Sequence, residues 1–233
     1  MPPERKEGQI RYPRANPDPR KEFVVTDAGR LDGGQAFVAA KYPPAKRTGT
    51  FFVHGFNSNF AEALYKDVQL RHDLEPPGLG VLFSWSSQAK ALSYAADRES
   101  ALFAHDAMAE ALMQMGRTNL GTFNLIAHSM GAFVTMETLR TPALNGDRDA
   151  LRQIHAVVLI SADLEIDLFR RQAPPMLAAV IPIFLLVSDN DEAPRISAML
   201  RGEQDRVGSV RDARELGGLD VSIIDLSAIK PDD

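Results

Sequence analysis

The sequence predicts an α/β protein built on a mainly parallel β-sheet of about eight strands flanked by helices. Short β-branched or aliphatic runs alternate with longer stretches whose apolar residues recur at helical spacing, a pattern typical of a parallel sheet wrapped by helices. A chain of 233 residues can also bury about 70% of its surface, which allows one substantial core without metals or disulfides. The predicted strands span residues 23–26, 35–39, 50–53, 81–84, 122–127, 156–160, 183–187 and 221–224.

Local sequence features also predict how two of these strands pair and where two helices lie. The first two predicted strands flank an Asp-Gly-Gly turn at residues 32–34, so we expect them to pair antiparallel at one edge of the sheet. One helix is expected to start at Met130 and to end near Arg140, because Pro142 cannot continue it. An earlier helix is indicated by apolar residues at three- and four-residue steps, which place one stripe against the sheet. That stripe consists of Ala101, Ala104, Met108, Ala111, Leu112 and Met115.

Residues 1–22 differ in composition from the rest of the chain. They hold five of the 15 prolines and ten charged residues, which leaves too little apolar surface to offset the entropy of ordering a backbone. We therefore predict a flexible arm at residues 1–22 and a single domain at residues 23–233.

The composition excludes several classes of function. The formal net charge of −5 gives no bias towards nucleic acid, and there is no cysteine for a disulfide scaffold, thiol catalysis or a Cys-ligated metal. Neither a G-x-G-x-x-G motif nor a phosphate loop with G-K-[ST] occurs. We therefore expect no cofactor, no metal and no nucleotide.

The sequence also predicts no membrane-spanning segment. Its longest apolar run, residues 176–187, is interrupted by Pro182 and is well short of the roughly 20 residues needed to cross a bilayer. The N-terminus is charged and contains prolines where a signal peptide has an apolar stretch. The compartment stays open: the cytoplasm is the default, with the periplasm or the cell envelope as alternatives.

The most informative segment is an apolar strand, then Ala-His-Ser-Met-Gly at residues 127–131, then an apolar helix. A hydroxyl nucleophile on a sharp turn between strand and helix needs small residues two positions before and after it, to avoid collisions. Ala127 and Gly131 meet that demand, so we predict that Ser129 is a nucleophile. The alternative is that Ser129 only caps the helix. His128 flanks Ser129 and is expected to point away from it.

A second segment, Phe-Phe-Val-His-Gly-Phe-Asn-Ser at residues 51–58, completes a site for acyl transfer. Gly55 removes the side chain that would block the following backbone amides from the cleft. We expect the amides of Phe56 and Met130 to form a two-donor oxyanion hole. His54 is expected to order this loop and not to act as the base.

Together these segments resemble the α/β-hydrolase superfamily. With Phe-Ser-Trp at residues 83–85, Tyr94 and Asp97, the resemblance narrows to a bacterial family of largely uncharacterised serine α/β-hydrolases, from about Gly49 onwards. In that family a proline normally follows the Phe-Ser-Trp motif, whereas this chain has Ser86. We expect Trp85, Tyr94 and Asp97 to serve packing and helix capping rather than catalysis.

The resemblance implies the chain order serine, acid, histidine, with the acid just after a late strand. It favours Asp191, while Asp189 is expected to be a solvated turn residue. Asp163 is the second candidate for the acid, although we expect it to cap a short helix at residues 164–170.

No histidine stands at the position in the chain where the resemblance implies the catalytic base. The five histidines, His54, His72, His105, His128 and His155, all precede Asp191, and none follows it. In the related family the catalytic histidine follows the last strand. We therefore hypothesise that the native polypeptide continues beyond Asp233 and carries a histidine within about fifteen residues. The alternative is a degenerate hydrolase that kept the nucleophile turn, lost the base and serves as a binding or scaffold protein. In either case this chain should be a poor catalyst.

The expected substrate is a small, accessible acyl ester. The connection from residue 163 to residue 180 is too short for a cap of several helices, so the cleft should be open. The basic side chains of the C-terminal third alternate with acidic ones and are expected to be solvated. They are Arg195, Arg201, Arg206, Arg211 and Arg214.

Overall fold

The computed structural model describes residues 2–6, 8–29, 48–116, 121–147, 151–188 and 206–229. In these parts of the chain the strands are β1 (Gly49–Val53), β2 (Leu79–Phe83), β3 (Phe123–His128), β4 (Ile154–Ile160), β5 (Ile183–Val187) and β6 (Ser222–Asp225). The α-helices are α2 (Phe60–Leu74), α3 (Tyr94–Gly116), α4 (Met130–Leu144) and α6 (Ile166–Ala178). Short 3-10 turns are η2 (Ala91–Ser93), η3 (Val207–Ser209) and η4 (Ala213–Leu216).

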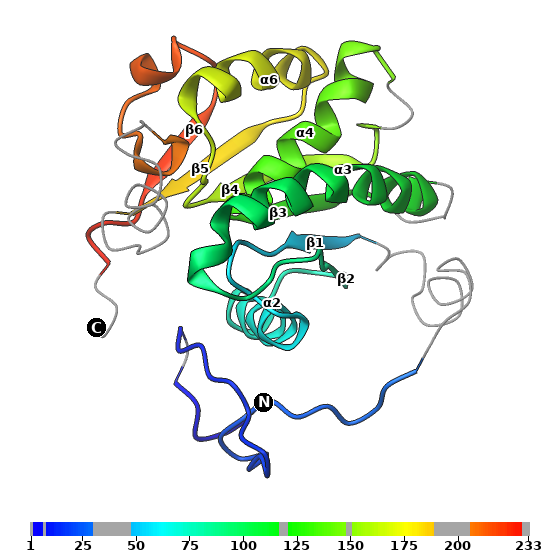
Figure 1. Ribbon diagram of the computed structural model, residues 1–233, viewed down its shortest axis with the longest axis vertical. Helices are drawn as coiled ribbons and strands as arrows, with labels where there is room; N and C mark the ends of the chain where they lie inside the picture. Colours follow the sequence, from blue (N-terminus) through cyan, green and yellow to red (C-terminus); the bar gives the residue numbers. More distant parts are fainter. Residues whose placement is uncertain are drawn as a thin grey trace.

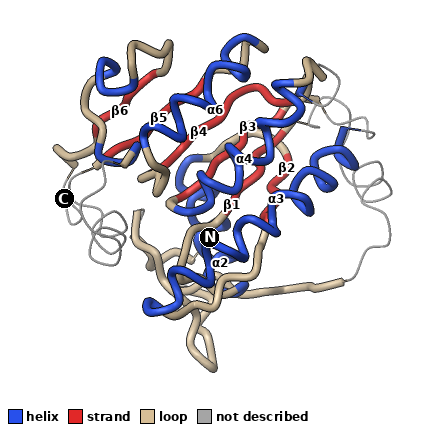
Figure 2. Tube along the Cα trace, turned by 45° about the horizontal axis from the view of Figure 1, so that its top comes forward, coloured by secondary structure: helices blue, strands red, loops and turns tan. Residues whose placement is uncertain are grey.

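The strands form one parallel sheet in the order β2-β1-β3-β4-β5-β6. Parallel neighbours need crossover connections, and helices α2, α3, α4 and α6 supply them between successive strands. Figure 1 shows α2 on one face of the sheet and α3, α4 and α6 on the other, and the tilted view in Figure 2 shows the same layers. The predicted α/β class with a mainly parallel sheet is therefore confirmed.

Six of the eight predicted strands are present, within two residues at each end. The prediction at residues 23–26 is wrong, because this stretch is neither strand nor helix. Its apolar residues serve another purpose: the Phe23 ring lies 5.5 Å from the His72 ring of α2, while Val25 is exposed. The predicted strand at 35–39 and the turn at 32–34 lie outside the described residues.

The core lies mainly between the sheet and helices α3, α4 and α6. Helix α4 is buried almost all round along its first ten residues, because it is packed between α3, α6 and the sheet. The stripe predicted for α3 is confirmed, since Ala101, Ala104, Met108 and Leu112 are buried. Ala111 and Met115 are partly buried against the same core.

Two helices contain prolines, and one of these, Pro142, was predicted to end its helix. Helix α4 does not end near Arg140 but includes Pro142 and reaches Leu144. Pro142 lacks the amide of one helical hydrogen bond, yet the amides of Asn145 and Asp147 still bond to Thr141 O and Pro142 O, at 3.0 and 2.9 Å. Helix α6 likewise contains Pro174 and Pro175 and starts at Ile166, two residues later than predicted.

The connection between β4 and β5 is fully described and consists mainly of α6. No cap domain is inserted there, as predicted. None of the described helices is both long and apolar enough to cross a membrane. The division into an arm and a domain stays a prediction: in its described part, the segment up to residue 29 forms neither helix nor strand.

Helix α2 carries a buried acidic residue, Asp67, whose side chain has one carboxylate oxygen without a hydrogen-bond partner among the described residues. Burial raises the pKa of Asp67 to about 6, and the nearby Arg71 only partly opposes this shift. Because the folded pKa lies above the unfolded value, the folded state holds a proton more tightly. Stability is therefore lost as the pH rises from about 4 to about 6.

We predict that Asp67→Asn stabilises the protein at pH 8 by about 2 kcal/mol and has little effect at pH 4, because the amide needs no deprotonation. Urea unfolding between pH 4 and pH 8 measures this difference. Asp167→Asn is the control, since Asp167 lies on α6 with a largely exposed side chain. A benefit from Asp67→Asn that stays constant across this pH range would contradict the prediction.

Candidate active site

Ser129 occupies a strained turn between β3 and α4. Its φ is +51° and its ψ is −122°, a conformation that costs a residue with a side chain about 1–3 kcal/mol. Hydrogen bonds hold the turn: the Ser129 amide donates to Ile160 O at 2.9 Å, and Ser129 O accepts from the amide of Asp163 at 3.2 Å. The side chain makes no capping bond to α4, so the interpretation of Ser129 as a helix cap is wrong.

Gly131 allows the start of α4 to approach the end of β1. A Cβ on Gly131 would lie 2.5 Å from Val53 O and 2.6 Å from His54 O, which is closer than real Cβ atoms come. The predicted need for a small residue two positions after Ser129 is thereby confirmed. Ala127, the small residue on the other side, is fully buried at the end of β3.

Gly55 brings the loop after β1 against the same turn. A Cβ on Gly55 would lie 2.8 Å from Ser129 Cβ and equally close to His128 Nδ1. This loop therefore faces Ser129, as expected for the segment that carries the Phe56 amide. The expectation that His128 points away from Ser129 stays a prediction; its Nδ1 lies beside the same point of the loop as Ser129 Cβ.

His54 and Trp85 hold the loop that carries Gly55 in place. The Nδ1–H of His54 donates to Gly55 O at 2.8 Å, and Nε2 accepts from the Trp85 amide at 3.1 Å. The Trp85 indole N–H donates to His54 O at 2.8 Å, and the two rings stack with centroids 5.2 Å apart. Burial lowers the pKa of His54, which keeps the ring neutral. With both nitrogens occupied, His54 orders the loop.

Asp163 lies at the centre of a buried polar cluster next to the Ser129 turn. Its carboxylate accepts a 2.5 Å hydrogen bond from the Tyr94 hydroxyl and lies 3.6 Å from the Arg206 guanidinium. The Tyr94 ring packs edge-on against Phe56, with centroids 5.2 Å apart. Asp163 thus links the Ser129 turn to the residue whose amide is expected in the oxyanion hole.

Two predictions fail at this cluster. Asp163 does not cap α6, because that helix begins at Ile166 with Glu165 at its N-cap. Arg206 is not solvated: its side chain is 4% exposed, and the adjoining amide of Val207 donates to Leu164 O at 2.9 Å. Both residues have partners far away in the sequence, which local patterns do not reveal.

The loop after β2 is held by Asp97, which is fully buried in the first turn of α3. Its carboxylate accepts hydrogen bonds from Ser87 Oγ at 2.5 Å and from the Gln88 amide at 2.8 Å. Asp97 therefore anchors the segment that follows Trp85 and does not cap α3.

Several predicted site features stay untested. Asp191, the favoured acid, lies outside the described residues, as does Asp189. All five histidines are described, and no hydrogen bond joins any of them to Ser129 within the described chain. Neither the Phe56 amide nor the Met130 amide donates one of the hydrogen bonds found in the turns, loops and helix ends of the described segments. Both amides therefore lack a backbone acceptor there.

The comparisons with known proteins agree with this architecture. Residues 43–233 match the family described as alpha/beta hydrolase of unknown function, DUF900. The chain belongs to this family. No curated protein sequence matches the chain.

Solved structures of other proteins share the fold. An uncharacterised protein from Bacillus cereus superposes with a TM-score of 0.50 at 15% identity, covering 85% of this chain and 57% of that protein. Lipase B from Aspergillus fumigatus gives a TM-score of 0.50 at 13% identity, covering 92% of this chain and 55% of the lipase. The chain thus spans just over half the length of either relative, and the likeness is one of fold.

We predict that Gly131→Ala destabilises the protein by about 3 kcal/mol, because its methyl group would overlap backbone oxygens that have no room to move. Gly116→Ala is the matched control, since a Cβ there meets nothing closer than 3.9 Å. Chemical denaturation measures both variants. Equal stability of the two variants would contradict the close approach of α4 to β1.

We predict that Tyr94→Phe costs about 2 kcal/mol, because it leaves the buried Asp163 carboxylate without its hydroxyl donor. The control is Tyr65→Phe, whose hydroxyl makes no hydrogen bond to another described residue. A double-mutant cycle with Asp163→Asn should show coupling between Tyr94 and Asp163. Additive effects of the two substitutions would argue against the cluster.

Proposed function

We propose that this α/β hydrolase is a serine hydrolase that acts on acyl esters, with Ser129 as the nucleophile. The observation that carries the proposal is the positive φ of Ser129 in a turn directly faced by the Gly55 loop. Strained backbone at such a turn is typical of a serine that presents its hydroxyl for attack.

In the proposed reaction, Ser129 Oγ forms a bond to the ester carbonyl carbon while its proton passes to a base. The amides of Phe56 and Met130 stabilise the oxyanion of the tetrahedral intermediate, and such a donor contributes about 3 kcal/mol. Collapse of the intermediate expels the alcohol, which takes up the proton. Attack of water on the acyl-serine then releases the acid and restores the hydroxyl.

Asp191 is proposed as the carboxylate that orients the base, following the order of residues in the family. The surroundings of Asp163 support a different use for it. Its carboxylate accepts a hydrogen bond from the Tyr94 hydroxyl and forms an ion pair with the Arg206 guanidinium. Its backbone amide donates a hydrogen bond to Ser129 O. We assign Asp163 to positioning the Ser129 turn.

The base is assigned to none of the five histidines in this proposal, because no hydrogen bond joins any of them to Ser129 among the described residues. His72 and His105 pair with the adjacent Asp73 and Asp106, His155 is exposed, and His54 is fully occupied. Without a base, the oxyanion hole and substrate binding leave about 10³ to 10⁴-fold acceleration over water. The same observation favours the second candidate function, a non-catalytic binding protein that keeps the Ser129 turn.

A small acyl ester is the proposed substrate, because α6 alone connects β4 to β5 and no cap covers the site from there. No nucleic-acid partner and no cofactor are part of the proposal.

The test is covalent labelling of the intact protein with a small fluorophosphonate, with and without added imidazole. We predict slow labelling at Ser129, acceleration by imidazole acting as the missing base, and no labelling of Ser129→Ala. Ser222→Ala, which changes an exposed serine at the start of β6, is the control and should label normally. Mass spectrometry of peptides locates the adduct.

Absence of labelling under both conditions would favour the binding protein. A normal enzymatic rate with a p-nitrophenyl ester and no imidazole would show that the assignment of the base is wrong.

A further inference from the structure

The N-terminal segment is attached to the outer face of α2 through a buried arginine. The Arg5 guanidinium forms a two-pronged ion pair with Asp73, with N–O distances of 2.6 and 2.7 Å, and the Gly8 amide donates to the same carboxylate at 2.8 Å. The Arg5 side chain is completely buried. These bonds hold the pKa of Asp73 at about 2, chiefly through Arg5. The geometry selects an arginine over a lysine, since only a guanidinium offers this fork.

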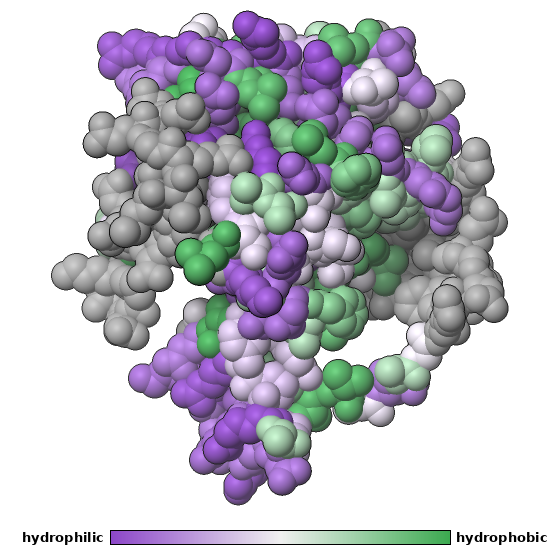
Figure 3. All heavy atoms as spheres, viewed as in Figure 1, coloured by the Kyte–Doolittle hydropathy of each residue, from purple (hydrophilic) through white to green (hydrophobic). Residues whose placement is uncertain are grey.

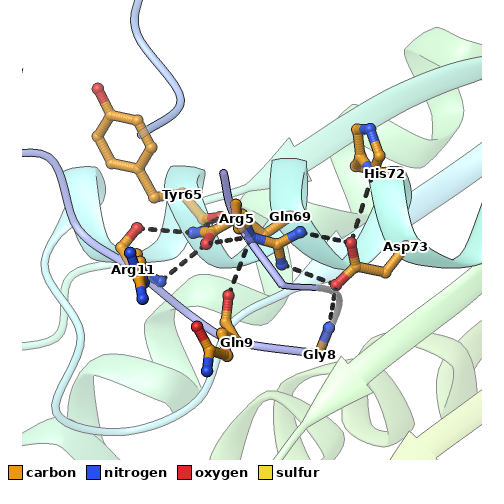
Figure 4. Close-up of polar contacts among 8 residues, drawn as sticks. All are labelled: Arg5, Gly8, Gln9, Arg11, Tyr65, Gln69, His72 and Asp73. Atoms are coloured by element: carbon orange, nitrogen blue, oxygen red, sulfur yellow. Dashed lines mark hydrogen bonds and ion pairs between the residues drawn. The ribbon is translucent and has the colours of Figure 1, made fainter. Parts of the chain in front are cut away.

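One helical turn earlier, Gln69 binds the backbone of the same segment. Its side-chain oxygen accepts from the Arg11 amide at 2.8 Å, and its side-chain NH₂ donates to Arg11 O at 2.9 Å. These two hydrogen bonds resemble those between neighbouring β-strands. They bind an extended backbone irrespective of the side chain at the bound position. Gln69 also accepts from Arg5 Nε at 3.3 Å, so the two contact points share one surface. Figure 4 shows both on the same face of α2.

Aromatic and backbone groups complete the pocket around Arg5. The guanidinium donates to Gln9 O at 3.0 Å and lies 5.4 Å from the centre of the Phe23 ring. That ring in turn packs edge-on against His72 of α2. A charge buried to this degree is stable only with its partner, so loss of either Arg5 or Asp73 leaves the other uncompensated.

The segment also closes on itself, which compensates for its low apolar content. The Glu4 amide donates to Arg20 O at 2.9 Å, and the Glu22 carboxylate accepts from Arg14 Nε and from the Asp18 amide, both at 3.0 Å. Figure 3 shows this part of the molecule as a mostly hydrophilic extension below the domain. Polar recognition, rather than a shared apolar core, therefore holds it in place.

Charge favours the same association. Residues 1–22 carry six basic and four acidic side chains, whereas the rest of the chain carries 20 basic and 27 acidic ones. A positively charged segment thus meets a negatively charged domain, and the covalent link gives it a high effective concentration.

We propose that the outer face of α2, at Gln69 and Asp73, is a binding site for an extended peptide with an arginine, and that the N-terminal segment, described at residues 2–6 and 8–23, occupies it as a separable ligand. The site recognises the guanidinium through Asp73 and the peptide backbone six residues further on through Gln69. Helix α2 begins just after the loop that carries Gly55 and Phe56, so the bound segment braces the helix that follows this loop.

The first arm of the test is limited proteolysis of the full chain with trypsin, followed at the bonds after Arg11 and Arg14. Arg5→Ala and Asp73→Asn should each speed cleavage at least tenfold, and Arg5→Lys should give an intermediate rate. The matched control is Arg20→Ala, because Arg20 pairs with Asp18 at the exposed surface of the segment and should leave the rate unchanged. Wild-type cleavage as fast as that of Arg5→Ala would overturn the proposal.

The second arm adds a fluorescent peptide of residues 2–24 to the full-length Arg5→Ala protein, whose own segment no longer fills the site. Anisotropy should show saturable binding that weakens at least tenfold when the peptide carries Arg5→Ala or the protein also carries Asp73→Asn. Circular dichroism confirms that each variant is folded. Equal affinity for both peptides would overturn the proposal, whatever the activity at Ser129.

Discussion

The close approach of the β1 exit loop to the β3–α4 turn is the constraint on which the rest of the site depends. The carbonyl oxygens of Val53 and His54 lie where a side chain on residue 131 would have to be, and a Cβ on residue 55 would collide with Ser129 and His128. Parallel pairing makes this meeting possible, because the carboxyl ends of β1, β3 and β4 share one edge of the sheet. The strain at Ser129 is sustained by the buried strand and helix on either side of it.

Pairs of residues distant in the sequence keep this arrangement rigid. The stacked rings of His54 and Trp85 join the ends of β1 and β2, while Tyr94 contacts both Phe56 and Asp163. These contacts have a fixed geometry, so the loop after β1 and the Ser129 turn are held in place before any ligand arrives. These contacts hold the segments around Ser129.

The features that the sequence predicted correctly depend on residues that lie close together in the chain. Apolar runs located the six strands of the sheet, and the small residues around Ser129 predicted its turn. The sequence did not reveal that Asp163 and Arg206 pair in the interior, because only the fold brings them together. The run at residues 23–26 has strand composition, yet Phe23 covers the buried Arg5 of the N-terminal segment. Pro142 was taken as a helix stop because propensity ignores the packing that carries α4 to Leu144.

In the proposed site, Ser129 Oγ faces the amides of Phe56 and Met130 across this close approach. A crystal structure of the protein phosphonylated in the presence of imidazole tests this arrangement directly. We expect an adduct on Ser129 with the phosphoryl oxygen about 2.7–3.1 Å from both amide nitrogens, and with φ of Ser129 still positive. An adduct on another residue, or a phosphoryl oxygen turned away from both amides, would contradict it.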